Sequence, residues 1–326
     1  MTSQTAPQKP IHKPVMLARV LLECEAVMRQ QGVFVDCTMG DGGHSYAIFQ
    51  DFIEGNSDQV LLSLDWDKEA YKFVTSFFKE HPLELAIDGT STQKSKNNWY
   101  YGHVNFAKLG IALDKLKKTA QLRNPYAKMI LFDLGISSRQ IAQKERGFSF
   151  TGKGKLDMRM DPDTYAIAAY DLLNSLSVAK LTTMFIASVG IKKQVARLLS
   201  QEIVAARTRK PFGNNEDVSR INGITSRIVP IRKGAIGRLH PSTLVFLALR
   251  IAVNTELFNL FEVLPIAKNF LTEGGKLLVM TYHSSEEKIV DKFVGMSHMS
   301  AKKYLPSKNE ILRNPRARSA KLFVIS

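Results

Sequence analysis

The chain has 326 residues, of which 44% are apolar and 23% are charged, so it is long enough for two domains and too apolar for a disordered chain. A formal net charge of +15 favours a polyanionic partner, nucleic acid or an anionic membrane, although a basic enzyme without such a partner would share this composition. The two cysteines, Cys24 and Cys37, predict neither disulfides nor a zinc site, and no apolar run reaches the roughly 18 residues of a membrane helix.

The chain begins with a segment that predicts a flexible tail. Residues 1–11 contain neither the apolar stretch of a signal peptide nor the arginines of a transit peptide. We therefore expect a reducing, intracellular compartment, the cytoplasm or an organellar matrix. Apolar residues at helical spacing from Leu17 to Cys24 then predict a first helix, with Cys24 and Cys37 as buried apolar residues.

The next part of the chain alternates between predicted strands and predicted helices. Strands are expected at 33–36, 60–65 and 129–133, helices from about His44 and through 70–78, and a loop over 88–100. This alternation predicts right-handed crossovers and a parallel, doubly wound α/β sheet. Ligands bind such sheets beyond the carboxyl ends of the strands. The glycine-rich stretch after the first strand, Asp65 and Asp133 should therefore line one crevice.

Residues 141–235 show a different pattern, with helical segments at 176–189 and 191–207, frequent Arg and Lys, and no long strand. We interpret them as a helical domain inserted into a sheet domain formed by 12–140 and 236–326. In the second part of the sheet domain we expect a long helix over 243–263 and a strand over 274–282. A capped helix should begin at Ser284, and a final strand should close the chain.

The glycine-rich stretch "CTMGDGGHS", residues 37–45, resembles a dinucleotide fingerprint only in part. The pattern G-x-G-x-x-G requires a third glycine where Ser45 stands, and Asp41 is a poor neighbour for a pyrophosphate. S-adenosylmethionine suits the stretch better, because its sulfonium tolerates nearby acids and its ribose diol can bind the carboxylate of Asp65. On these residues alone a nicotinamide cofactor and a purely structural turn stay open.

Longer motifs carry further information. The most specific are "ERGFSF", "LDMRMD" and "NPRARSAKL", and the others include "HKPVM", "DCTMGDGGHS", "LDWD", "DLGISSRQI" and "GGKLLVMTYHSSEEKIV". With these stretches, in the family's order from about residue 12 to residue 324, the chain resembles the bacterial-type ribosomal small-subunit (16S) RNA cytosine-N4 methyltransferase family, which also has organellar members. The resemblance implies a class I, Rossmann-like methyltransferase fold with an inserted helical domain.

The resemblance also implies that the cofactor is S-adenosylmethionine and that no metal is needed. Two glycines would let the backbone approach the donor, an aromatic ring would lie against its adenine, and a carboxylate would bind its ribose. The implied donor contacts are Gly42, Gly43, His44, Asp65, Phe106, Asp133 and Gln140. The chain departs from the family pattern at Met39 and Asp41 in the glycine loop, in "SSRQI" for "SSPQL", in "TYHSSEEK" for "SFHSLEDR", and at Leu244 and Leu247.

The implied reaction is methylation of the N4 amine of a cytidine in small-subunit ribosomal RNA, in its decoding region by the resemblance. That amine is a weak nucleophile, so a hydrogen-bond acceptor should hold it, and Asp133 is the first catalytic candidate. Basic clusters predict the RNA-binding surface, at Arg207, Arg209, Lys210, Arg232, Lys233, Arg316 and Arg318. The partner would be the RNA or the assembled subunit. The alternatives are an NAD-dependent oxidoreductase and a catalytically inactive RNA-binding or ribosome-assembly factor.

Overall fold

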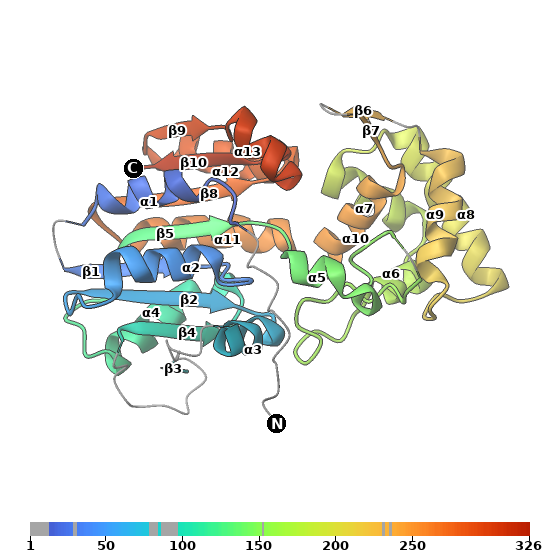
Figure 1. Cartoon of the computed structure of the whole chain (residues 1–326). Helices are drawn as coiled ribbons and strands as arrows, with labels where there is room; N and C mark the ends of the chain where they lie inside the picture. The colour runs from blue at the N-terminus through green and yellow to red at the C-terminus, as the bar shows by residue number, and fades with distance from the viewer. Residues whose placement is uncertain are drawn as a thin grey trace, which may run out of the picture.

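The protein consists of a sheet lobe and a helical lobe that lie side by side (Figure 1). The computed structural model describes residues 13–28, 31–77, 84–85, 97–151, 153–229, 232–234 and 237–326. The predicted tail, residues 1–11, lies outside the described residues. The two lobes are joined where the chain leaves β5 (Ala127–Asp133) and again at α10 (Ser242–Val253) and α11 (Glu256–Asn269).

In the described part of the chain, the sheet lobe is built on eight strands in the order β3-β4-β2-β1-β5-β8-β10-β9. The parallel part also includes β1 (Gly32–Asp36), β2 (Gln59–Asp65), β3 (Glu84–Leu85), β4 (Trp99–His103) and β8 (Leu271–Thr281). At one edge, β10 (Lys321–Ile325) runs antiparallel to both β8 and β9 (Ala301–Tyr304). The topology confirms the predicted doubly wound, mostly parallel α/β sheet.

Helices cover both faces of the sheet, because successive side chains of a buried parallel strand point to opposite faces. On β1, for example, Val33 and Val35 pack on one face and Phe34 on the other. The first face is covered by α4 (Leu109–Thr119), α11 and α12 (Ser284–Ser297). The second is covered by α1 (Leu17–Glu25), α2 (Gly43–Ile48) with the π-helix Phe49–Ile53, and α3 (Lys68–Phe77).

The helical lobe has a hydrophobic core of its own. It contains α6 (Ala169–Ser175), α7 (Val178–Val189), α8 (Lys193–Arg209), α9 (Asp217–Ile228) and α10, with the hairpin β6 (Arg232–Gly234) and β7 (Gly237–Leu239). Because Val245, Phe246 and Leu249 of α10 belong to this core, the described lobe extends to Val253, beyond the boundary expected at 235. No single described helix is long and apolar enough to cross a membrane; α10 and α11 pass that test only together, bent by 56°.

The structure differs from the sequence prediction in three elements. The helix expected over 243–263 is two helices, interrupted at Thr255, whose φ of 49° breaks the helical path. Strand β4 begins at Trp99, inside the segment expected to be a loop, because its aromatic run follows a polar stretch directly. Strand β9, Ala-Lys-Lys-Tyr, was not predicted, since short lysine-containing edge strands carry little hydrophobic pattern. Cys24 and Cys37 are buried free thiols, as predicted.

Candidate active site

A cavity of about 420 Å³ lies where the carboxyl ends of the parallel strands face the helical lobe. Its walls come from the loop after β1, the ends of β2, β5 and β8, helix α5 (Ser138–Ala142), and the α10–α11 junction. Residues 314–319, directly before β10, close one side. The cavity therefore includes the crevice at which the sequence placed the glycine loop, Asp65 and Asp133.

The glycine loop forms one wall of the cavity, and its glycines have different structural roles. Gly40 and Gly43 line the cavity, whereas Gly42 is not among the lining residues and instead adopts a φ of 80° at the start of α2. A Cβ on Gly43 would collide with the ring of Pro14, so the "HKPVM" segment packs directly on the loop. The loop is therefore built without side chains where backbone must face the cavity.

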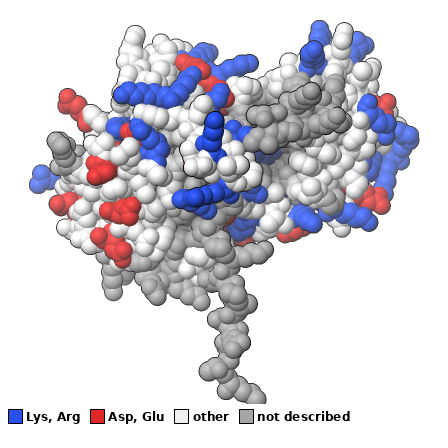
Figure 2. Space-filling view, turned by 45° about the horizontal axis from the view of Figure 1, so that its top comes forward, with Lys and Arg blue, Asp and Glu red and all other residues white. Residues whose placement is uncertain are grey.

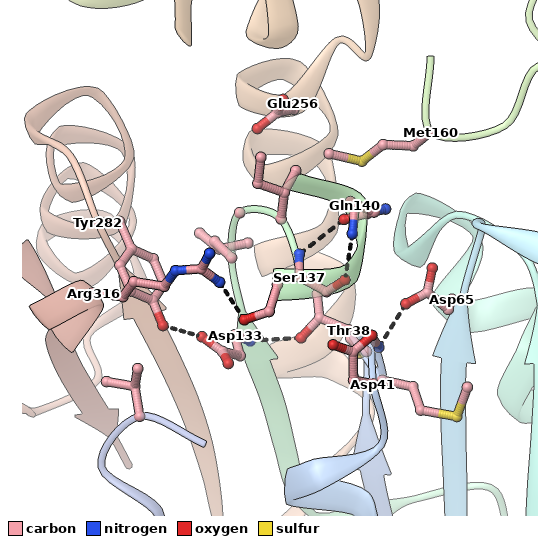
Figure 3. Close-up of a pocket in the computed structure, with 18 of the residues that line it drawn as sticks. Thr38, Asp41, Asp65, Asp133, Ser137, Gln140, Met160, Glu256, Tyr282 and Arg316 are labelled. Carbon is pink, nitrogen blue, oxygen red and sulfur yellow. Dashed lines mark hydrogen bonds between the residues drawn. The ribbon is translucent and has the colours of Figure 1, made fainter. Parts of the chain in front are cut away.

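Asp65 holds the glycine loop in place. Its Oδ2 accepts a hydrogen bond from the Gly40 amide at 2.7 Å (Figure 3). Its Oδ1 accepts one from the Asp67 amide at 2.8 Å. Burial raises the pKa of the Asp65 carboxyl to about 7, with the nearby charge of Asp67 acting in the same direction. Each carboxylate oxygen retains a second lone pair, so the group can still accept hydrogen bonds from a ligand.

The acid in the glycine loop is neutralised by the protein itself. Arg139 Nε donates to Asp41 Oδ1 at 3.2 Å, and Arg139 Nη2 lies 3.8 Å from Asp67 Oδ2. Arg139 belongs to α5, so the ion pair links this helix to the loop. Asp41 and Arg139 are two of the positions at which the chain departs from the family pattern, and here they compensate each other. The protein thus places a cation of its own beside Asp41.

Gln140 lines the cavity, but both ends of its amide already have partners. Its Oε1 accepts from the Ser137 amide at 2.9 Å, and its Nε2 donates to Asp67 Oδ2 at 2.7 Å. Together with the bond from the Gln140 amide to Ser137 Oγ, the first contact forms a capping box for α5. Gln140 therefore links α5 to Asp67, and it also lines the cavity.

Asp133 lies at the end of β5 and faces the centre of the cavity (Figure 3). Its amide donates to Thr38 Oγ1 at 2.6 Å, and its Oδ1 accepts from the Tyr282 hydroxyl at 2.6 Å. Its Oδ2 lies 3.5 Å from His44 Nε2. His44 is buried, lines the cavity, and has no hydrogen-bond partner within the described residues at either ring nitrogen. Asp133 and His44, both predicted site residues, thus meet.

The cavity fits S-adenosylmethionine. The ring nitrogens of His44, which make no hydrogen bond within the described residues, and the Gly40–Gly43 backbone offer polar contacts, and Asp65 offers a carboxylate next to them. Phe106 lines the same cavity and packs against Phe132 in a T-shaped contact, with ring centroids 5.5 Å apart. Within the described residues no group of three or more metal-ligating side chains is present.

Comparison with known proteins decides the family. The sequence profile of the MraW methylase family matches residues 9–326. The chain belongs to this family. Proteins named ribosomal RNA small subunit methyltransferase H from Coprothermobacter proteolyticus, Pseudothermotoga lettingae and Chlorobium luteolum are 37%, 32% and 34% identical to it. Each alignment covers 96% of this chain, and 95%, 97% and 95% of the respective relative.

Two sequence motifs that point to the MraW methylase family lie at the junction of the lobes. Arg146 of "ERGFSF" donates to Asp67 Oδ2 at 2.5 Å and to the carbonyls of Arg159 and Met160 at 2.9 and 3.1 Å. Met160 belongs to "LDMRMD" and lines the cavity. Asn254, at the α10–α11 break, accepts from the Met160 amide at 2.9 Å. These bonds attach the helical lobe to Asp67, whose amide binds Asp65.

The residues predicted to bind RNA differ from one another in their surroundings. Arg207 donates to the carbonyls of Leu173 and Leu176, both at 2.7 Å, and so caps the end of α6. Lys210 pairs with Glu216 at 2.6 Å, whereas Arg209 is exposed. Arg232 lies in β6 next to Lys233, but neither side chain is among those described.

The other predicted basic residues come from the C-terminal motif. Arg316 is exposed, lines the cavity, and donates to Ser138 Oγ (Figure 3), whereas Arg318 is partly buried. Lys13 lines the same mouth. On the face shown in Figure 2, blue side chains gather at the centre, where the lobes meet, and over the helical lobe. The structure thus places Arg316 in the same cavity as the residues predicted to bind the methyl donor, whereas Arg207 caps the end of α6.

Several cavity residues escaped the sequence analysis. Tyr282, Glu286 and the Arg250–Glu256 pair, with bonds of 2.8 and 2.9 Å, all line the cavity. The stretch "TYHSSEEK" contains no local pattern that predicts the contact between the tyrosine hydroxyl and Asp133. The pairing of Arg250 and Glu256 depends on the bend between α10 and α11, which was expected to be continuous.

Proposed function

We propose that the chain transfers a methyl group from S-adenosylmethionine to the N4 amine of a cytidine in small-subunit ribosomal RNA. Membership of the MraW methylase family supports the reaction, and the printed names of the relatives support the RNA. One observation carries the proposal. The residues suited to bind the methyl donor, in the loop from Gly40 to His44 and at Asp65, line the same cavity as the carboxylate of Asp133.

Six residues are assigned to the donor or its immediate support. Asp65 binds the ribose diol, Phe106 lies against the adenine, and the backbone of Gly43 with His44 contacts the methionine part. Gly42 and Gln140 act indirectly, through the shape of the loop and the position of α5. The bound donor supplies an electrophilic methyl group, to which the amine nitrogen bonds as the carbon–sulfur bond breaks.

Asp133 is assigned to the cytosine amine. Its Oδ2 can accept a hydrogen bond from N4, which fixes the amine and draws electron density toward the nitrogen. One amine proton must leave after the transfer, and the carboxylate or a water molecule next to it can accept that proton. The target base must leave its stack to enter the cavity, because the carboxylate of Asp133 lines that cavity.

RNA would enter over the mouth of the cavity and across the helical lobe. Arg316 and Lys13 lie at this mouth, and Arg209 extends the basic surface, with Arg232, Lys233 and Arg318 as further proposed contacts. Lys210 contributes less because Glu216 neutralises it. Phosphate contacts of this kind release counterions, so RNA affinity should fall steeply with salt. The enzyme would work wherever small subunits are made, in the cytoplasm or an organellar matrix.

The decisive test is nucleoside mass spectrometry of small-subunit RNA that lacks the modification, after incubation with protein and donor. Naked RNA and assembled subunits are offered in parallel, because either can be the substrate. N4-methylcytidine in one of them supports the proposal. Formation of 5-methylcytidine or methyladenosine would contradict the assigned chemistry. Donor binding by calorimetry without any transfer to either substrate would favour an inactive RNA-binding factor, and NAD binding would favour an oxidoreductase.

A further inference from the structure

One carboxylate oxygen of Asp133 accepts a hydrogen bond from Tyr282, a residue that has no role in the reaction as proposed above. The hydroxyl of Tyr282 donates to Asp133 Oδ1 at 2.6 Å, the short distance typical of a charge-assisted hydrogen bond. The same hydroxyl lies 3.3 Å from Met280 Sδ, a much weaker acceptor. Its single proton therefore goes to the carboxylate.

The tyrosine itself is held firmly. It directly follows β8, whose Met280 pairs with Asp133 of β5, so the two side chains extend from neighbouring strand ends. The Tyr282 amide donates to Glu286 Oε2 at 2.7 Å, and the His283 amide donates to the same oxygen at 3.2 Å. Glu286 is buried in the first turn of α12. A capping interaction thus fixes the backbone from which the ring of Tyr282 reaches Asp133.

The consequence is a carboxylate with one fixed and one available oxygen. A terminal carboxylate rotates over a broad torsional well, so an unheld Asp133 would present its oxygens to the cavity in many orientations. With Oδ1 bound to Tyr282, Oδ2 faces the space next to His44. We propose that Tyr282 is a positioning residue, whose hydroxyl orients Asp133 so that Oδ2 accepts the hydrogen bond of the cytosine amine. This inference rests on the proposed function.

Four charged or titratable groups from other elements act on the pair within the described residues. His44 approaches Oδ2 from α2, and the buried carboxyl at the end of β1, Asp36, interacts electrostatically with both His44 and Asp133. Glu286 adjoins Tyr282 from α12, and the charge of Glu310, in α13 (Lys308–Arg313), also acts on the tyrosine. Burial and then the charge of Asp133 hold the pKa of the Tyr282 hydroxyl well above its ordinary value of 10, so the hydroxyl remains a donor at every working pH.

The experiment is a double-mutant cycle of Tyr282→Phe and Asp133→Asn on methyl transfer to small-subunit RNA. Tyr282→Phe keeps the ring and removes only the hydroxyl. We expect kcat to fall roughly 10- to 100-fold, the range for loss of a hydrogen bond to a charged group, with the KM for RNA and the donor affinity within about twofold. In the Asp133→Asn background the same change should cost almost nothing, since the residue acts through the carboxylate.

The split between kcat and KM provides a readout that a merely structural residue would not change. An unchanged kcat, a loss confined to KM, or an equal loss in both backgrounds would overturn the inference. A lower melting temperature with weaker donor binding would assign Tyr282 to packing and overturn it as well. If the parent protein makes no N4-methylcytidine, the proposed function fails first.

Discussion

The pH dependence of donor binding tests the role of Asp65 most directly. Burial raises the pKa of this carboxyl to about 7 from an ordinary value of 3.8. In the protein without donor, the stabilisation that goes with the protonated form is present below about pH 4 and is lost as the pH rises to about 7. A ribose diol that donates to the carboxylate favours its ionised form, so donor binding should strengthen over the upper part of that window.

The expected magnitude follows from the titration. With a pKa of about 7, roughly nine tenths of the groups are ionised at pH 8 and roughly one tenth at pH 6. Donor affinity should therefore be about tenfold weaker at pH 6, which corresponds to about 1.4 kcal/mol. Isothermal titration calorimetry in buffers with different ionisation enthalpies should also show that binding at pH 6 releases close to one proton from the protein.

A matched variant separates this effect from the donor's own chemistry, because the amino group of the donor also titrates in the neutral range. Asp65→Asn cannot ionise, so only the donor's contribution should remain. Binding at pH 8 should be roughly 10- to 100-fold weaker, since the charge-assisted bonds are lost and an amide NH₂ must face the Gly40 or Asp67 amide. Equal pH dependence in the two proteins would refute the ribose assignment.

Three further variants test the lobes and the RNA surface. Arg207→Ala should lower the melting temperature by several degrees, because two helix-terminal carbonyls lose their partner, and a parental melting curve would contradict the cap. Replacing Arg209 and Lys210 together should flatten the log–log salt slope of RNA affinity by about 1 to 2 units without changing donor affinity, so an unchanged slope would remove both from the surface. Arg146→Ala should lower both the melting temperature and kcat, since Asp67 and the helical lobe lose their link; kcat equal to that of the parent would show that this link is dispensable.

The correctly predicted parts of the molecule are those with strong local patterns. Strands β1, β2 and β5 are apolar runs buried on both faces, and each is followed by a polar group at the carboxyl end. Because parallel strands bring these ends together, the sequence alone was sufficient to place the glycine loop, Asp65 and Asp133 at one site. The prediction was wrong where the local pattern is weak, as at the edge strand β9 and at the helix break at Thr255.

The sequence by itself determined the doubly wound sheet, the glycine loop and the family motifs, because each depends on residues close together in the chain. Only the tertiary structure decided which distant groups pair. It placed Arg139 against Asp41, Arg207 on the carbonyls that end α6, and the Tyr282 hydroxyl on Asp133, 149 positions away. Such contacts depend on how strands and helices from separate segments pack, and no local periodicity encodes the partner of a long polar side chain.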